Sequence, residues 1–150
     1  MIFEKKTAVF AVAFILAAAS VFSQTTGNSD EPLYIVFSAN SAELKEVGSE
    51  VAIRNSQVFI KVAQLLLENA DYRILIDGHA NPVEKTRQEE TGSLRPLSVR
   101  RAEATANFLI TYYGVDRSRL VLTGAGGGYP FGDTDPALNR RVSFFIIPAK

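Results

Sequence analysis

The sequence contains no cysteine, no tryptophan and a single histidine among its 150 residues. The absence of cysteine excludes a disulfide framework, a cysteine nucleophile and a cysteine-based metal site. A lone histidine also excludes a multi-histidine metal centre, so we expect neither a metal nor any other cofactor. The charges balance, with 16 basic and 16 acidic residues. This excludes the strongly basic surface that is typical of nucleic-acid-binding proteins.

Long apolar runs are also absent after the first residues. At the start, Lys5 and Lys6 precede an apolar stretch at 7–19, and Ser23 offers a small residue before Gln24. This order is typical of a secretory signal peptide. The stretch is shorter than the about 20 apolar residues that a membrane helix needs. We predict a signal peptide at 1–23, with an uncleaved membrane anchor as the alternative. Because no cysteine follows, attachment of a lipid to cysteine is excluded.

The predicted signal peptide carries Glu4, Lys5 and Lys6, so residues 24–150 keep 14 of the 16 basic and 15 of the 16 acidic groups. A chain of this length buries a substantial core without disulfides. The polar residues that follow the signal peptide contain no regular apolar pattern. We therefore predict a flexible lead-in at 24–32 and one domain at 33–148.

Strand and helix patterns alternate along the domain. Short β-branched or aromatic runs are typical of buried strands, and apolar residues at helical spacing indicate amphipathic helices. The predicted strands are 33–37, 73–77, 120–123 and 141–147, and the predicted helices start at Asn55 or Ser56 and after the N-cap residue Ser98. The order β-α-β-α-β-loop-β predicts an α/β two-layer sandwich, with the helices on one face of a mixed sheet. Strand–helix–strand units imply parallel neighbours, while the direction of the last strand stays open.

Two segments between these elements are predicted to be loops. Residues 82–96 are almost entirely polar, and an exposed loop of this length is often functional or mobile. Residues 124–136 are rich in glycine and proline. Their glycines resemble a phosphate-binding loop only weakly, because no helix begins after them. We therefore predict a turn there.

Arg100 and Arg101 lie near the predicted start of the second helix, where positive side chains gain nothing from the helix dipole. For Arg100 we expect a solvated side chain or a salt bridge to Asp77 or Glu103. Arg101 has a functional interpretation. A guanidinium beside the free backbone N–H groups of a helix start is a good receptor for a carboxylate.

Five motifs in this order resemble a known family. They are I-D-G-H-A-N at 76–81, L-S-V-R-R-A at 97–102, Y-G-V-D-R-S-R-L at 113–120, G-A-G-G-G-Y-P at 124–130 and N-R-R-V at 139–142. Together they resemble the OmpA-like C-terminal domain, a peptidoglycan-binding module of Gram-negative envelopes. The resemblance covers about Leu33 to Ile147, and several spaced motifs in order are far more specific than any one alone.

The resemblance implies a periplasmic protein, with association to the outer membrane as a further option, that binds peptidoglycan without being an enzyme. Its site would grip the diamino acid of a stem peptide, which is diaminopimelate or, because Asn81 replaces an acidic residue, ornithine or lysine in its place. Arg101 matches the family's carboxylate-binding arginine. Asn81 stands at the position of the family's aspartate, which holds the ammonium group. The remaining matching positions are Asn40, Ala80 and Arg140.

Two other functions remain open. The uncharged Asn81 and a loop about five residues longer than usual are departures from the family pattern. Such a chain fits a structural or protein-interaction module that has weakened or lost wall binding, with loop 82–96 contacting an envelope protein. The third hypothesis is a wall hydrolase that uses His79 with Asp77. Against it, His79 has no serine partner at a suitable spacing, and a turn histidine that bonds backbone is the simpler interpretation.

Overall fold

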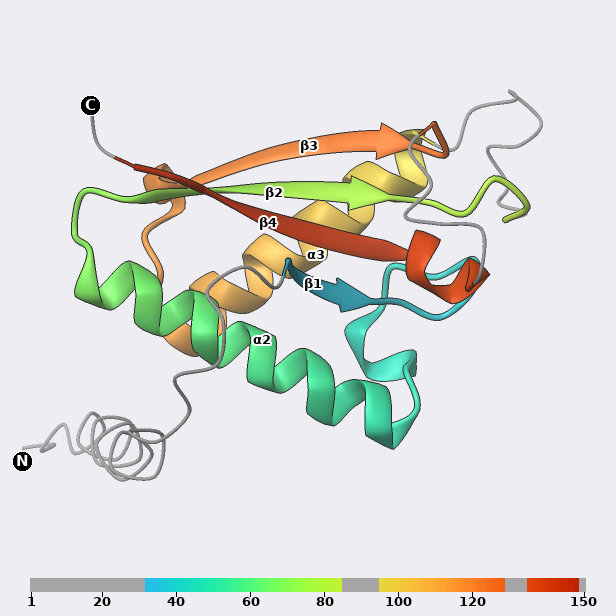
Figure 1. Cartoon of the computed structure of the whole chain (residues 1–150), viewed down its shortest axis with the longest axis horizontal. Helices are drawn as coiled ribbons and strands as arrows, with labels where there is room; N and C mark the ends of the chain where they lie inside the picture. Colours follow the sequence, from blue (N-terminus) through green and yellow to red (C-terminus); the bar gives the residue numbers. More distant parts are fainter. Residues whose placement is uncertain (1–31, 85–94, 129–134, 149–150) are drawn as a thin grey trace, which may run out of the picture. The chain divides into compact units, whose positions relative to one another are not determined.

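Four strands and two long helices form the part of the chain that the computed structural model describes, residues 32–84, 95–128 and 135–148 (Figure 1). The strands are β1 (Leu33–Val36), β2 (Arg73–His79), β3 (Leu120–Gly126) and β4 (Arg141–Ile147), the long helices are α2 (Ser49–Glu68) and α3 (Arg95–Tyr113), and short 3-10 turns are η1 (Leu44–Glu46), η3 (Arg117–Arg119) and η4 (Pro136–Asn139). The predicted two-layer sandwich is confirmed. The predicted signal peptide and most of the predicted lead-in lie outside the described residues.

The strands form one mixed sheet in the order β1-β4-β2-β3. The crossover through α3 joins β2 and β3 as parallel neighbours, as predicted. The expectation that β1 and β2 would be neighbours was wrong, because β4 lies between them and is antiparallel to both. The first four residues of β4 are buried, which suits a strand that pairs on both edges.

Both long helices cover the same face of the sheet, with α3 across β2 and β3 and α2 beside β1 (Figure 1). The core between the layers is apolar and includes Ile35, Phe59, Val62, Ile74, Leu109 and Val142. These residues repeat at period two on strands and at helical spacing on helices, so the sequence pattern that predicted the elements is also the pattern of burial. In the described ranges, no helix is both long and apolar enough to span a membrane.

A pair of glycines lets α3 approach the sheet closely. Gly78 of β2 and Gly124 of β3 lie opposite each other in the parallel ladder. A Cβ atom on Gly78 would lie 1.9 Å from the carbonyl oxygen of Ser98, and one on Gly124 would lie 2.7 Å from the Ser98 hydroxyl oxygen. Only glycine fits at such a distance. The first turns of α3 therefore sit directly on the strands.

Helix α3 begins four residues earlier than predicted. It starts at Arg95, and Ser98 lies within its first turn instead of capping it. The fully buried Ser98 hydroxyl donates to the carbonyl of Arg95 and accepts from the N–H of Gly126. The side chain thus fixes the helix start to the end of β3, which itself extends beyond the predicted 120–123 into the glycine segment.

Helix α2 also begins earlier than predicted, at Ser49 after the extended residue Gly48. Asn55, predicted as a helix cap, instead lies inside the helix and is buried. Its side chain accepts a hydrogen bond from the N–H of Val36 and donates one to the carbonyl of Val36. Asn55 therefore connects α2 to strand β1.

The carboxyl end of α2 is capped from a distant part of the chain. The Arg119 guanidinium donates to the backbone carbonyls of Leu66, Asn69 and Tyr72. The last carbonyls of a helix have no partner inside the helix. Arg119 supplies a donor to one of them, that of Leu66, and also binds the turn that follows the helix at Asn69 and Tyr72. Arg119 belongs to the motif Y-G-V-D-R-S-R-L, and its role in the fold is structural, since it joins this segment to the end of α2.

Candidate functional site

The candidate site lies at one end of the sheet, where four parts of the chain meet. These are the segments after β1 and β2, the beginning of α3, and the turn η4 that leads into β4 (Figure 1). Parallel β1 and β2 both end here, and β4 begins here. The topology therefore collects residues that are up to about a hundred positions apart, such as Phe37 and Arg140.

Arg101 is the centre of this region, and its side chain is fully buried. A guanidinium carries five N–H donors in a planar fork. Nε donates to the carbonyl of Ser41 at 2.9 Å, Nη1 to that of His79 at 2.9 Å and Nη2 to that of Ser38 at 3.1 Å. The two remaining donors, one on each Nη, bond the carboxylate of Glu84. Every donor of Arg101 is thus used within the chain.

Glu84 places its carboxylate in a cradle of donors. Oε2 accepts from Arg101 Nη1 at 2.8 Å and from the N–H of Asn81 at 2.7 Å. Oε1 accepts from Arg101 Nη2 and, at 2.7 Å, from the N–H of Asn40. Each oxygen therefore receives one guanidinium and one backbone hydrogen bond. Such charge-assisted, bidentate contacts are strong polar interactions. The cradle is a carboxylate receptor, and the occupant is the chain's own side chain.

The predicted location of Glu84 was wrong. The polar segment 82–96 was predicted to be an exposed loop, but Glu84 is only 4% exposed. Asn81 and Glu84 close a tight turn through a hydrogen bond from the Glu84 N–H to the Asn81 carbonyl. The turn aims the Glu84 side chain back toward Arg101. Arg95 and Pro96, which were predicted to belong to this loop, are the first two residues of helix α3. Residues 85–94 lie outside the described residues.

The prediction that Arg101 uses the free N–H groups of a helix start was also wrong in its geometry. Because α3 begins at Arg95, Arg101 lies in the second helical turn. The N–H groups beside it come from Asn40 and Asn81, in the segments after β1 and β2. The Phe37 ring lies under the guanidinium, with 5.4 Å between Arg101 Cζ and the ring centroid. Cation–π attraction to this ring further stabilises the positive charge of Arg101.

Asn81, predicted to face the ligand's ammonium group, has its side-chain amide occupied. Oδ1 accepts from the N–H of Val83 at 3.0 Å, and Nδ2 donates to the carbonyl of Pro136 at 2.7 Å. The side chain is 3% exposed. An aspartate could accept the first bond, but it could not donate the second. Asn81 therefore suits its contact with Pro136, and its backbone N–H serves the cradle.

The structure brings the other predicted site residues to the same end of the sheet. Asn40 has a φ of 58°, in the left-handed region that asparagine tolerates better than most residues. That conformation accompanies the N–H bond to Glu84. Ala80 is buried, and its N–H donates to the carbonyl of Gly126. Arg140 is half-buried, and its Nε donates to the carbonyl of Phe37 at 3.2 Å. Arg100 is exposed.

Buried His79 and half-buried Asp77 form a separate pair on β2. His79 Nε2 lies 3.1 Å from Asp77 Oδ2 and 3.5 Å from Arg141 Nη2. The expectation of a turn histidine that bonds backbone was wrong, because the ring contacts side chains from within a strand. Burial, and next the charge of Arg141, lower the pKa of His79 below its ordinary 6.5, while Asp77 acts in the opposite direction. No group of three or more His, Asp or Glu side chains in the described ranges is placed to hold a metal.

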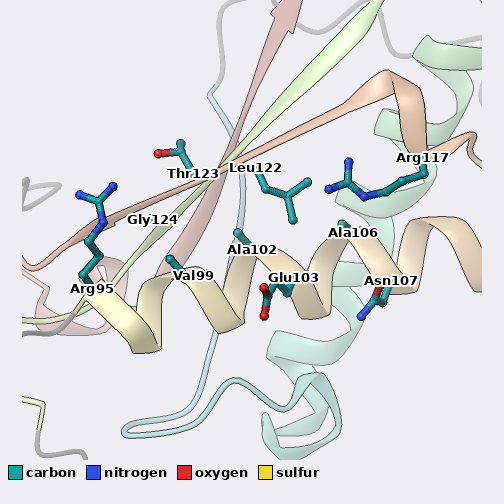
Figure 2. A pocket seen from close by; sticks show the side chains of 10 residues that line it. All are labelled: Arg95, Val99, Ala102, Glu103, Ala106, Asn107, Arg117, Leu122, Thr123 and Gly124. Carbon is teal, nitrogen blue, oxygen red and sulfur yellow. The ribbon is translucent and has the colours of Figure 1, made fainter. Parts of the chain in front are cut away.

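A hollow of about 550 Å³ lies elsewhere, between α3 and β3. Figure 2 shows Arg95 and Arg117 at its two ends, with Glu103 and Asn107 on the helix between them. None of the predicted site residues lines it. The cradle around Arg101 is not hollow because Glu84 fills it.

Sequence reasoning missed the role of Glu84 and the use of backbone N–H groups by Asn40 and Asn81. The spacing held one available signal. Asn81 is followed three residues later by Glu84, with Pro82 between them, and such an Asx-Pro start favours a turn that folds back on itself. The partner of the glutamate could not be read from spacing, because Arg101 approaches from another element.

The comparisons with known proteins agree with the fold. A family model described as the OmpA family matches residues 36–142. The C-terminal domain of Helicobacter pylori MotB is 22% identical and has a TM-score of 0.60, covering 80% of this chain and 87% of that one. The peptidoglycan-associated lipoprotein of Burkholderia pseudomallei is 22% identical (TM-score 0.59, 76% and 89% covered). The OmpA-like domain of FopA1 from Francisella tularensis is 18% identical (TM-score 0.61, 83% and 79% covered). No curated protein matches the chain.

Proposed function

The chain belongs to the OmpA family, and we propose that it binds peptidoglycan non-covalently in the periplasm, as a binding module and not as an enzyme. One observation carries the proposal. The cradle of Arg101 and two backbone N–H groups has the donors that a carboxylate requires, and a carboxylate lies in it. Peptidoglycan stem peptides present such carboxylates. A structural neighbour is named a peptidoglycan-associated lipoprotein, which supports the same function.

Each predicted residue has a distinct proposed role. Arg101 binds a stem carboxylate through its fork, and Asn40 and Asn81 bind it through their N–H groups. Ala80 holds the segment after β2 against β3 through its N–H bond to Gly126. Arg140 ties the segment after β1 to β4 through Phe37 and offers a further positive charge at this end of the sheet.

The receptor chemistry also selects among stem peptides. Diaminopimelate ends its side chain in both an ammonium and a carboxylate group, whereas ornithine and lysine end in an ammonium group alone. A buried guanidinium attracts the carboxylate that only diaminopimelate offers there, and it repels an ammonium group. The Asn81 amide is committed to Pro136 and Val83, so it offers no charge to an ammonium group. We therefore propose diaminopimelate as the preferred stem residue.

The test combines sedimentation with intact sacculi and calorimetric titration of the three stem peptides. We expect heat from the diaminopimelate peptide alone, and we expect Arg101→Ala to abolish both signals. The matched control is Arg100→Ala, since Arg100 is the exposed neighbour on the same helix. Circular dichroism must show that each variant is folded. A folded Arg101→Ala protein that still sediments with sacculi would remove Arg101 from the site.

The second candidate is a structural or protein-interaction module. It is favoured by the internal completeness of the site, in which all donors of Arg101 and both ends of the Asn81 amide have partners within the chain. An envelope protein would then be the partner. Crosslinking in cells, with and without deletion of 83–92, distinguishes the two. Sacculus binding by the deletion variant together with unchanged crosslinks would count against this second candidate.

A further inference from the structure

We infer that Glu84 is an internal ligand of the Arg101 receptor, and that an external carboxylate binds by displacing it. This inference rests on the proposed function, because it concerns the same receptor. The basis is the set of four hydrogen bonds to Glu84, two from the guanidinium and two from backbone N–H groups. A bound carboxylate ligand would need the same four. Glu84 and such a ligand therefore exclude each other.

The receptor does not depend on Glu84 for its shape. Arg101 is held from the other side by the carbonyls of Ser38, Ser41 and His79. These three bonds fix the plane of the guanidinium and leave one donor on each Nη directed at the occupant. When the Glu84 side chain rotates out, a preformed fork remains. Preorganisation of this kind lowers the cost of binding a new ligand.

The support for Glu84 itself is local. Its backbone is held by the turn in which the Glu84 N–H bonds the Asn81 carbonyl. Within that turn, Val83 is 77% exposed, so the turn lies at the molecular surface. Displacement of Glu84 thus needs rearrangement of a short surface turn and leaves the sheet and α3 unchanged. Glu84 can therefore leave the receptor without disturbing the bonds that hold Arg101 in place.

An internal ligand lowers the apparent affinity of the receptor for external ligands. The apparent affinity of a ligand equals its affinity for the open receptor multiplied by the fraction of molecules whose receptor is open. If Glu84 were absent from the cradle in about one molecule in a hundred, binding would be about a hundredfold weaker than that of an empty receptor. A simple carboxylate replaces four hydrogen bonds with four equivalent ones and gains little. Only a ligand with additional contacts displaces Glu84 effectively.

The experiment empties the receptor with Glu84→Ala and uses Glu103→Ala as the matched control, because Glu103 is an exposed glutamate on α3. Sodium acetate is the first probe, compared with sodium chloride at equal ionic strength. We expect acetate to raise the unfolding temperature of Glu84→Ala saturably, by about 3–4 °C or more. The wild type and Glu103→Ala should respond no more to acetate than to chloride.

Sacculi are the second probe. We expect Glu84→Ala to sediment with sacculi at least tenfold more tightly than the wild type. An acetate effect without sacculus binding by any variant would support the internal-ligand inference and overturn the proposed wall function. Equal sacculus binding by Glu84→Ala and the wild type, with no acetate effect, would overturn the inference and leave wall binding intact.

A second substitution keeps the test decisive if Glu84→Ala does not fold. Glu84→Gln retains the length of the side chain, but its NH₂ group faces donors in the cradle. It should occupy the receptor more weakly and bind sacculi at least about threefold more tightly than the wild type. An unchanged sacculus affinity of folded Glu84→Gln would overturn the inference.

Discussion

The buried pair of Arg101 and Glu84 should be irreplaceable by apolar side chains, and stability measurements can test this. Glu84→Ala leaves one donor on each Nη of a fully buried guanidinium without a partner, together with the N–H groups of Asn40 and Asn81. Removing one member of a buried ion pair costs about 3–5 kcal/mol. Against a total unfolding free energy of about 5–15 kcal/mol, that is a large loss.

The double variant Arg101→Met with Glu84→Ala is the sharper perturbation. In many proteins a buried ion pair can be exchanged for apolar residues at little or no cost. Here the pair also satisfies five backbone groups, namely three carbonyls bonded to Arg101 and two N–H groups bonded to Glu84. Each buried group left without a partner costs about 1–3 kcal/mol. The double variant should therefore be at least as unstable as Glu84→Ala.

Urea unfolding at equilibrium measures these changes through the midpoint and the slope of the transition. Glu103→Ala is the control and should change the unfolding free energy by less than about 0.5 kcal/mol. A double variant as stable as the wild type would refute the reasoning. It would mean that the backbone groups around the site find water or new partners without cost.

Three further outcomes are expected. Gly78→Ala should destabilise the fold by about 2–3 kcal/mol in urea unfolding, because its Cβ would lie 1.9 Å from a backbone oxygen. Gly48→Ala, whose Cβ meets open space, should cost under about 1 kcal/mol in the same measurement. Arg119→Ala should cost about 2 kcal/mol or more in urea unfolding, since three carbonyls lose a charged donor; a loss no larger than that of exposed Arg117→Ala would contradict this. Burial lowers the folded-state pKa of His79, so the unfolded chain takes up the proton first and stability present above about pH 6.5 is lost as the pH falls below it. His79→Gln should flatten that profile between pH 7.5 and 5.5, and an equally steep profile would argue against this origin.

The arrangement of layers was accessible from the sequence because it follows from periodicity. Residues such as Ile74 and Val62 recur at the spacing of their elements, and the structure buries them on the face where the layers meet. The boundaries were less accessible. Ser98 and Asn55 have the side chains of helix caps, yet Asn55 makes both of its side-chain hydrogen bonds to a strand, and Ser98 accepts one from a strand while it donates within its own helix. Local propensity cannot distinguish a cap from a tertiary contact made by the same polar group.

The position of β4 between β1 and β2 could not be predicted from local patterns either. The sequence of a strand that follows a loop does not indicate which strands lie beside it in the sheet. The site shows the same division between local and long-range information. Arg101 was identified as a carboxylate receptor from its chemistry, but its occupant, Glu84, comes from a turn that spacing had assigned to an exposed loop. Contacts between distant elements decide such pairings.

The bonds between Asn55 and Val36 have a consequence for association with other chains. Strand β1 is at the edge of the sheet, and an edge strand presents free N–H and carbonyl groups on which a foreign strand can grow. The side-chain amide of Asn55 has the same donor and acceptor as a peptide group and occupies both groups of Val36. It acts as a single residue of an additional strand. The position of Val36 on this edge is thus unavailable to a foreign strand, because one amide carried on a helix already occupies it.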